Sequence, residues 1–327
     1  LLPSMRSVLK AAPRAQPASL EGRVAWVIGG VGVVGSGICR GLLRAGATVI
    51  VNSRSVDRLE SLSSSLGNPE KLVCINHSML ADGAKETVER AIQQTGRLDH
   101  VVAHSSVRWW ALDSGDDGAM EGELPDPRQR LLEVSPHAYE AATAKAAGLH
   151  YSAAHHLLPR MSEGGSYTFV TGGSRSLAWG PRGALGQLNT HGVRALAGAL
   201  RLDQAARFEA GGAYGVVDVQ ELRVGLAFEG QGAALQRVEN RGISGFKLDP
   251  AREEPLSQGV GTVCAGICAN TVAEAASPTD PPVVLATTLP PKVRPRDGLL
   301  VVSNLDDLAS LRQAFPVRDE EFAHFFA

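Results

Sequence analysis

The stretch VAWVIGGVGVVGSGICRGLLRAGA, residues 24–47, decides the fold of this chain. Its first five residues are apolar and mostly β-branched or aromatic, which predicts a strand that is covered on both faces. A glycine cluster follows, and apolar side chains then recur at helical spacing until Gly46. The stretch therefore predicts a strand, a tight glycine turn and a helix, in that order.

The same alternation of strands and helices continues toward residue 276. It predicts a doubly wound parallel sheet of the Rossmann type, an α/β fold, because parallel strands need crossover helices between them. Further strands are predicted at residues 48–54, 71–76, 96–106, 166–173 and 215–224, and helices at residues 56–66, 83–94, 138–161, 190–208 and 259–276.

Three segments depart from this alternation. Residues 108–136 are acidic and rich in glycine and proline, which predicts an inserted loop within a domain that spans residues 21–290. Residues 291–327 are predicted as a C-terminal extension with a short strand near residue 300 and a final helix. Residues 1–20 are basic and contain no acid, which is typical either of an ordinary tail or of the remnant of a transit peptide for a mitochondrion or plastid.

Composition excludes several classes of protein. Apolar residues make up 44% of the chain and charged residues 20%, so a sizeable core is expected. The net charge of −2 gives no field for nucleic acid, and no apolar run reaches the roughly 18 residues of a membrane-spanning helix. The four cysteines form no CxxC pair, so we predict neither a disulfide framework nor a metal site.

Residues 30–35 read Gly-Val-Gly-Val-Val-Gly, a GxGxxG pattern directly after the first predicted strand. Glycines let the backbone approach a pyrophosphate, and the N-terminus of the following helix offers free N–H donors. The pattern predicts dinucleotide binding, and the alternative is a glycine turn that has lost its ligand.

The end of the second predicted strand bears on the type of cofactor. Residues 51–54 read Val-Asn-Ser-Arg and contain no carboxylate that would bind an NAD ribose. Arg54 suits a 2′-phosphate, so NADP is favoured over NAD, unless Arg54 is only an exposed charge at the end of a strand. The predicted cofactor-binding residues are Gly29, Gly30, Gly32, Val33, Gly35, Ser53, Arg54, Asn76 and His104.

Residues 20–275 resemble the short-chain dehydrogenase/reductase family. GGVGVVG stands where this family has TGxxxGxG, with Gly29 and Gly35 as the outer glycines and Val33 in place of the middle one. RAGATVIVNSRS is similar to the second helix and strand of NADP-type members, and residues 103–106, AHSS, replace the family's NNAG. The resemblance implies the family's fold and a nicotinamide cofactor.

The resemblance fails at the catalytic positions. In this family a Tyr-x-x-x-Lys pair on the helix after the fifth strand carries the proton chemistry, and RALAGALR places Gly186 and Thr190 there, or Gln187 and His191 after a shift of one residue. We therefore predict no catalytic residue. The tyrosines are Tyr139, Tyr151, Tyr167 and Tyr214, and the lysines are Lys10, Lys71, Lys85, Lys145, Lys247 and Lys292, all outside this helix.

Substitutes for the missing pair are weakly indicated. Lys145, Arg175, Arg182 and His191 are candidates to face the site, but each residue type is also common on helix surfaces. Cys264 and Cys268 are typical of a buried pair, and the adjacent histidines at 155–156 diverge on a helix, so neither pair predicts a metal site.

Three functions fit these observations. The favoured one is a catalytically degenerate protein that serves as an accessory or scaffold subunit of a larger organelle complex, with NADP(H) bound structurally and other protein subunits as partners. The alternative is an active NADP-dependent oxidoreductase with a rearranged site, whose substrate the sequence does not identify. The third is a nucleotide sensor that reports through the loop at residues 108–136.

Overall fold

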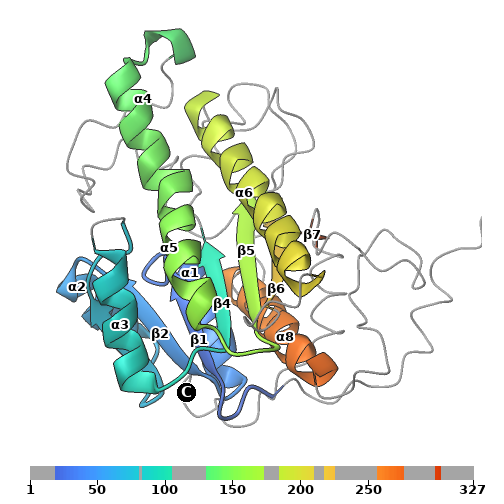
Figure 1. Ribbon diagram of the computed structural model, residues 1–327. Coiled ribbons are helices and arrows are strands. Elements are labelled where there is room, and N and C mark those ends of the chain that lie inside the picture. Colours follow the sequence, from blue (N-terminus) through green and yellow to red (C-terminus); the bar gives the residue numbers. More distant parts are fainter. Residues whose placement is uncertain are drawn as a thin grey trace, which may run out of the picture.

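Seven parallel strands form one sheet, in the order β3-β2-β1-β4-β5-β6-β7 (Figure 1). The structure is a computed structural model and describes residues 19–80, 83–104, 130–172, 184–209, 217–224, 256–275 and 299–302. The strands are β1 (Val24–Ile28), β2 (Thr48–Ser53), β3 (Leu72–Asn76), β4 (His100–His104), β5 (Ser166–Gly172), β6 (Asp218–Val224) and β7 (Leu299–Val302).

The chain reverses its direction of travel across the sheet between β3 and β4, because β4 returns to the free side of β1. This order is that of a doubly wound fold, in which ligands bind at the carboxyl edge beside the reversal point. The predicted α/β fold is confirmed. The helices are α1 (Val33–Arg44), α2 (Val56–Ser65), α3 (Ala84–Thr95), η3 (Leu131–Glu133), α4 (Pro136–Thr143), η4 (Ala144–Gly148), α5 (Leu149–Leu157), η5 (Leu158–Arg160), α6 (Ala184–Glu209) and α8 (Leu256–Ala275).

Helices cover both faces of the sheet. Alternate strand residues such as Val27 and Val102 form one apolar core with α1, α2 and α8. Their neighbours Trp26 and Val101 form the other core with α3, α5 and α6. Because both faces of the sheet are covered, β1, β2 and β4 contain continuous buried apolar runs, which is why these strands were predictable from the sequence.

Two predicted helices differ from those observed. The helix predicted at 190–208 begins at Ala184, because the alanine, leucine and glutamine before residue 190 favour helix and outweigh one glycine. The helix predicted at 138–161 consists of α4, a π-helical turn at η4, and α5, which follow one another without a break. This long helix lies beside α6 (Figure 1). A π turn inserts one residue into the helix without ending it, so the apolar spacing does not reveal it.

The described residues include only part of the segments that depart from the alternation. Leu299–Val302 confirms the short strand and pairs with β6, so the sheet takes one strand from the predicted C-terminal extension. Residues 1–18, 105–129 and the predicted final helix lie outside the described residues.

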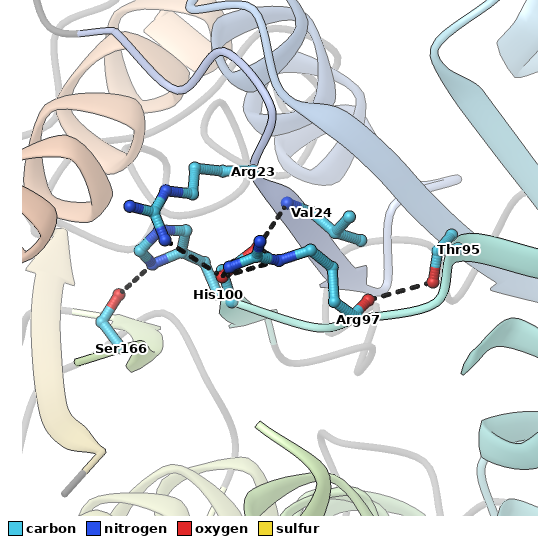
Figure 2. Close-up of polar contacts among 7 residues, drawn as sticks. Arg23, Val24, Thr95, Arg97, His100 and Ser166 are labelled. Atoms are coloured by element: carbon cyan, nitrogen blue, oxygen red, sulfur yellow. Dashed lines mark hydrogen bonds and ion pairs between the residues drawn. The ribbon is translucent and has the colours of Figure 1, made fainter. Parts of the chain in front are cut away.

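A polar cluster lies at the amino edge of the sheet, and Figure 2 shows its members Arg23, Val24 and Arg97, which contact Asp99. The buried Asp99 carboxylate accepts a hydrogen bond from the Val24 N–H at 2.9 Å and forms ion pairs with Arg97 and Arg23. Burial alone would raise the pKa of Asp99, but the Arg97 and Val24 hydrogen bonds and nearby positive charge lower it. The cluster links β1 to β4 at the amino edge. Doubly wound folds bind ligands at the carboxyl ends of their strands, so a ligand site is expected at the opposite edge.

Candidate functional site

The glycine turn after β1 lies at the carboxyl edge of the sheet, and close backbone approaches define its shape. Gly29 has a φ of +79°, which favours glycine, and a Cβ there would lie 3.0 Å from the carbonyl oxygen of His104 at the end of β4. A Cβ on Gly35 would lie 2.1 Å from the carbonyl oxygen of Gly29. The turn therefore folds back onto the first turn of α1, and only glycine fits at these two positions.

The N-terminus of α1 follows at once and is not capped by a side chain. Its N-cap is Gly32, and no acidic residue lies in the first turn. The first N–H groups of a helix have no partner within the helix, and they carry the positive end of the helix dipole. Val33, which stands where the family pattern has its middle glycine, is the first residue of α1. It is 41% exposed, so an apolar side chain lies at the surface beside the turn.

The end of β2 supplies the polar side chains of the same edge. Arg54 is exposed, and the Ser53 hydroxyl accepts a hydrogen bond from the Ser55 N–H at 3.1 Å. Asn76 at the end of β3 donates from Nδ2 to the Ser53 carbonyl at 3.1 Å. Residues 52–56 contain no carboxylate, and the nearest acid in sequence is Asp57 in the first turn of α2.

The structure thus brings all the predicted cofactor-binding residues to one edge of the sheet, in two groups. Gly29–Gly35 and His104 surround the start of α1 between β1 and β4, while Ser53, Arg54 and Asn76 lie at the ends of β2 and β3. The donor set fits a dinucleotide: backbone N–H groups at the turn would bind a pyrophosphate, and polar side chains at the end of β2 would bind a ribose.

The second half of this edge contains no tyrosine–lysine pair among the described side chains. Tyr139 and Tyr151 are exposed on α4 and α5, and Tyr167 is fully buried inside β5, where burial raises the pKa of its phenol well above the usual value. Lys71 and Lys85 bind Glu21 and Glu89 away from α6. The side chain of Lys145 and all of Tyr214 lie outside the described residues.

A buried charged network lies between α6 and β6 instead. Glu221, in the middle of β6, is almost completely buried and accepts a hydrogen bond from the Thr171 hydroxyl at 2.7 Å. Arg194 of α6 forms an ion pair with the same carboxylate at 3.7 Å from Nε. Arg194 lies one helical turn beyond Thr190, so this network occupies the protein interior next to the aligned lysine position.

Sequence reasoning missed this network. Glu221 stands between Gln220 and Leu222 in DVQELRV, and so many polar residues are more typical of a strand with one solvated face. The only signal was an acidic residue in a strand that the rest of the fold requires to be covered on both faces. Its partner Arg194 is far away in sequence, so their pairing is a product of how α6 packs on the sheet.

Other predicted candidates do not form a site. Cys264 and Cys268 are both fully buried, and burial raises the pKa of both thiols. His155 and His156 are in edge-to-face contact with ring centroids 4.8 Å apart, and no group of three or more His, Cys, Asp or Glu side chains in the described ranges is arranged to hold a metal. Arg175 and Arg182 lie outside the described residues.

The fold is of the Rossmann type, with a glycine turn at the position where such folds bind a dinucleotide. Residues 23–147 match the family model described as short chain dehydrogenase. This part of the chain is thus similar to the short-chain dehydrogenases, as its motifs predict. A sequence comparison with curated proteins gave no match.

Solved structures share this fold at low sequence identity. A dehydrogenase/reductase from Sinorhizobium meliloti 1021 is 16% identical with a TM-score of 0.55, over 80% of this chain and 91% of that chain. A short-chain dehydrogenase/reductase (glucose/ribitol dehydrogenase) from Brucella melitensis is 16% identical with a TM-score of 0.55, over 88% and 96%. An NADPH-bound short chain oxidoreductase with an atypical catalytic center, from Pseudomonas aeruginosa PAO1, is 20% identical with a TM-score of 0.52, over 68% and 79%.

Within the described segments, no helix has both the length and the apolar character needed to cross a bilayer.

Proposed function

We propose that this protein binds NADP(H) at the carboxyl edge of β1 and β2 and does not carry out the tyrosine-dependent reduction of its family. The bound nucleotide is structural, and the protein serves as an accessory subunit of a larger complex in a mitochondrion or plastid. The observation that carries the proposal is the contrast between a turn that keeps Gly29 and Gly35 and an α6 that contains neither tyrosine nor lysine.

The cofactor assignment is supported by the charges at the end of β2. Arg54 is exposed and directly follows Ser53 in sequence, and no carboxylate lies at residues 52–56. A guanidinium forms forked, charge-assisted hydrogen bonds with a phosphate, whereas NAD offers only ribose hydroxyls at this position. Arg54 and Ser53 therefore hold the 2′-phosphate, and the N–H groups of the glycine turn and of the first turn of α1 hold the pyrophosphate.

Titration of the protein with NADPH and NADH tests the cofactor assignment. The wild type is expected to bind NADPH more tightly, and Arg54→Gln is expected to weaken NADPH binding by about tenfold or more because it removes a charge-assisted contact. The affinity for NADH should stay within about twofold, since NADH has no 2′-phosphate. Equal affinity of the wild type for both nucleotides would refute the assignment to NADP(H).

The catalytic part of the proposal has a separate test. Oxidation of bound NADPH is followed by stopped-flow absorbance with a panel of carbonyl and enone compounds. We expect no turnover above that of the Gly30→Asp, Arg54→Asp double variant, which has no nucleotide site. Nucleotide-dependent turnover in the wild type would favour an active NADP-dependent oxidoreductase, for which the NADPH-bound Pseudomonas protein with an atypical catalytic center gives a precedent.

Purification of the untagged protein from its source under mild conditions tests the accessory role. We expect it to elute with other polypeptides at a mass far above 34.4 kDa. A free monomer or a simple homo-oligomer would contradict that role without affecting the assignment of the nucleotide.

A further inference from the structure

The indole of Trp26 makes a polar contact with a side chain at the margin of the apolar core. Trp26 lies in the middle of β1 and is completely buried. Its Nε1 donates a hydrogen bond to Oδ1 of Asn52 at 3.1 Å, and Asn52 is the second-last residue of β2. A buried indole N–H without a partner is unfavourable, so the core itself requires a polar acceptor at this position of β2.

Asn52 connects this indole to the third strand. Its Nδ2 donates to the carbonyl oxygen of His77 at 3.3 Å, just after the end of β3. One amide side chain therefore uses its acceptor on β1 and its donor on the segment after β3. The three strands β1, β2 and β3 are linked at the carboxyl edge by this single side chain.

The far end of the link is fixed to α3. The His77 ring shares a hydrogen bond of 2.8 Å between Nδ1 and the Thr87 hydroxyl, and its Nε2 lies 3.1 Å from the Glu86 carboxylate. Thr87 is itself buried and donates to the carbonyl oxygen of Gly83. The His77 backbone is thus held by a helix that packs on the sheet, and the carbonyl that receives Asn52 has a defined position.

The residues next to Asn52 in sequence are those assigned to the 2′-phosphate. Ser53 follows directly, and its carbonyl is held by Asn76 from the other side. Ser53 Oγ accepts from the Ser55 N–H, and the Ser55 hydroxyl accepts from the Arg58 N–H as the N-cap of α2. The backbone that carries Arg54 is therefore restrained on both sides, by the Asn52 link before it and by the cap of α2 after it.

We propose that the hydrogen-bonded chain from Trp26 through Asn52 to His77 is a positioning device that gives the nucleotide site its preference for NADP(H). This inference rests on the assignment of Ser53 and Arg54 to the 2′-phosphate. A forked contact between a guanidinium and a phosphate depends on direction, so displacement of the end of β2 weakens it. NADH makes no such contact there and is less sensitive to the same displacement.

Trp26→Phe is the main test, because it removes the indole N–H while it keeps an aromatic ring in the core. We expect the ratio of NADH to NADPH dissociation constants to fall by about three- to tenfold, the range expected for one net hydrogen bond. Asn52→Ala removes both bonds of the amide and should lower the ratio at least as much. Asn52 is half-buried, so this second variant remains informative if the Trp26 variant does not fold.

The matched control is Phe169→Leu. Phe169 is also completely buried in a central strand and on the same face of the sheet as Trp26, but it lies in β5. Its replacement should reduce stability and leave the nucleotide ratio within about twofold, because a general loss of core packing weakens both nucleotides alike.

Hydrogen exchange of the nucleotide-free protein measures the positioning directly. Trp26→Phe should speed exchange at the Ser53–Ser55 amides more than Phe169→Leu does. Unchanged exchange there, or a nucleotide ratio within about twofold of wild type in both Trp26→Phe and Asn52→Ala, overturns the inference. A wild type that does not prefer NADPH refutes the assignment to NADP(H) instead, and the exchange measurement still decides whether the chain of hydrogen bonds orders this segment.

Discussion

Two parts of one sheet edge are built differently. In the first half, residues 24–76, the carboxyl edge presents backbone N–H groups at the glycine turn and the exposed Arg54. In the second half, residues 100–224, Arg194 of α6 and Glu221 of β6 form a buried ion pair. The Thr171 hydroxyl donates a hydrogen bond to the same carboxylate. The first half thus exposes a charged side chain at this edge, whereas Arg194 and Glu221 of the second half pair inside the protein.

This difference shows which property of a nucleotide-dependent fold depends on the backbone and which on side chains. Pyrophosphate binding uses backbone N–H groups, which any sequence supplies, provided that positions 29 and 35 are glycine so that the turn can form. Proton transfer requires particular side chains with suitable pKa values. A sequence can therefore change α6 completely and keep a glycine turn whose N–H groups are suited to a pyrophosphate.

The largest expected effect comes from breaking the buried pair of the second half. Arg194→Met should lower the free energy of unfolding by about 3–5 kcal/mol, because it leaves the Glu221 carboxylate buried without its cation. Urea unfolding followed by circular dichroism measures this change. A loss below about 1 kcal/mol would mean that the pair contributes little to the second half.

The double variant Arg194→Met, Glu221→Leu is the matched control. It replaces both charges by apolar groups of similar size and should recover most of the lost stability, as replacements of whole buried pairs often do. Its affinity for NADPH should equal that of wild type, because neither residue lies in the first half. Loss of NADPH binding in the folded double variant would show that the two halves are coupled.

The turn of the first half should respond to a single methyl group. In Gly35→Ala the new Cβ meets the Gly29 carbonyl oxygen at 2.1 Å, so the turn must open. We expect a loss of about 1–3 kcal/mol in stability, typical of overpacking, and at least tenfold weaker NADPH binding by titration.

Gly198→Ala is the control for this prediction. Gly198 lies within α6, and a Cβ there meets nothing closer than a side-chain nitrogen of Arg201 at 4.0 Å. Alanine favours helix over glycine by up to about 1 kcal/mol, so this variant should be as stable as wild type or slightly more stable. Equal NADPH affinity in the Gly35 and Gly198 variants would remove the turn from the binding site.

Acid should act on the second half through two buried histidines. Burial lowers the pKa of His150 to about 4. The pKa of His100 is also lowered to about 4, mainly by burial, with Arg23 and Arg97 adding to the effect and Asp99 opposing it. Below a pH of about 6.5 the unfolded chain takes up protons that the folded protein excludes until a pH near 4. Stability is therefore full above pH 6.5 and falls toward pH 4, by about 1–2 kcal/mol per histidine at pH 5.

Urea unfolding at pH 7 and at pH 5 checks this dependence. His150→Leu should reduce the difference between the two pH values by about 1–2 kcal/mol, since leucine takes up no proton. The same change at the exposed His137 on α4 should leave the difference as in wild type. An equal pH dependence in wild type and His150→Leu would show that His150 does not resist protonation in the folded protein.

The same two halves differ in how well the sequence predicts them. The strands of the first half and the turn follow from local patterns: an apolar run, a glycine cluster and a helical spacing within residues 24–47. The polar groups that matter in the second half come from elements far apart in the sequence. Thr171 and Glu221 are 50 residues apart, and no local pattern indicates that α6 brings Arg194 to them.

The candidate site shows the same limit on a smaller scale. The motif predicts which residues gather at the carboxyl edge, because the glycine turn and the strand ends are fixed by the fold. It does not predict the bond between Trp26 and Asn52, since the polar character of a buried indole is not visible in an apolar run. Side-chain pairs between strands depend on register and rotamer, which the periodicity of one strand does not contain.

The smallest expected effect tests whether the first half acts through its carboxyl edge alone. Lys71 lies just before β3, at the amino edge, and its Nζ binds the Glu21 carboxylate at 2.6 Å and the Gly46 carbonyl oxygen at 3.2 Å. Both side chains of the ion pair are largely exposed, and exposed pairs contribute about 0–1 kcal/mol. Lys71→Gln should therefore change the stability by less than about 0.5 kcal/mol and leave the NADPH affinity unchanged, as thermal unfolding and titration will show. A clear loss of NADPH affinity in this variant would mean that the whole first half, and not only its glycine turn and the end of β2, sets the geometry of the nucleotide site.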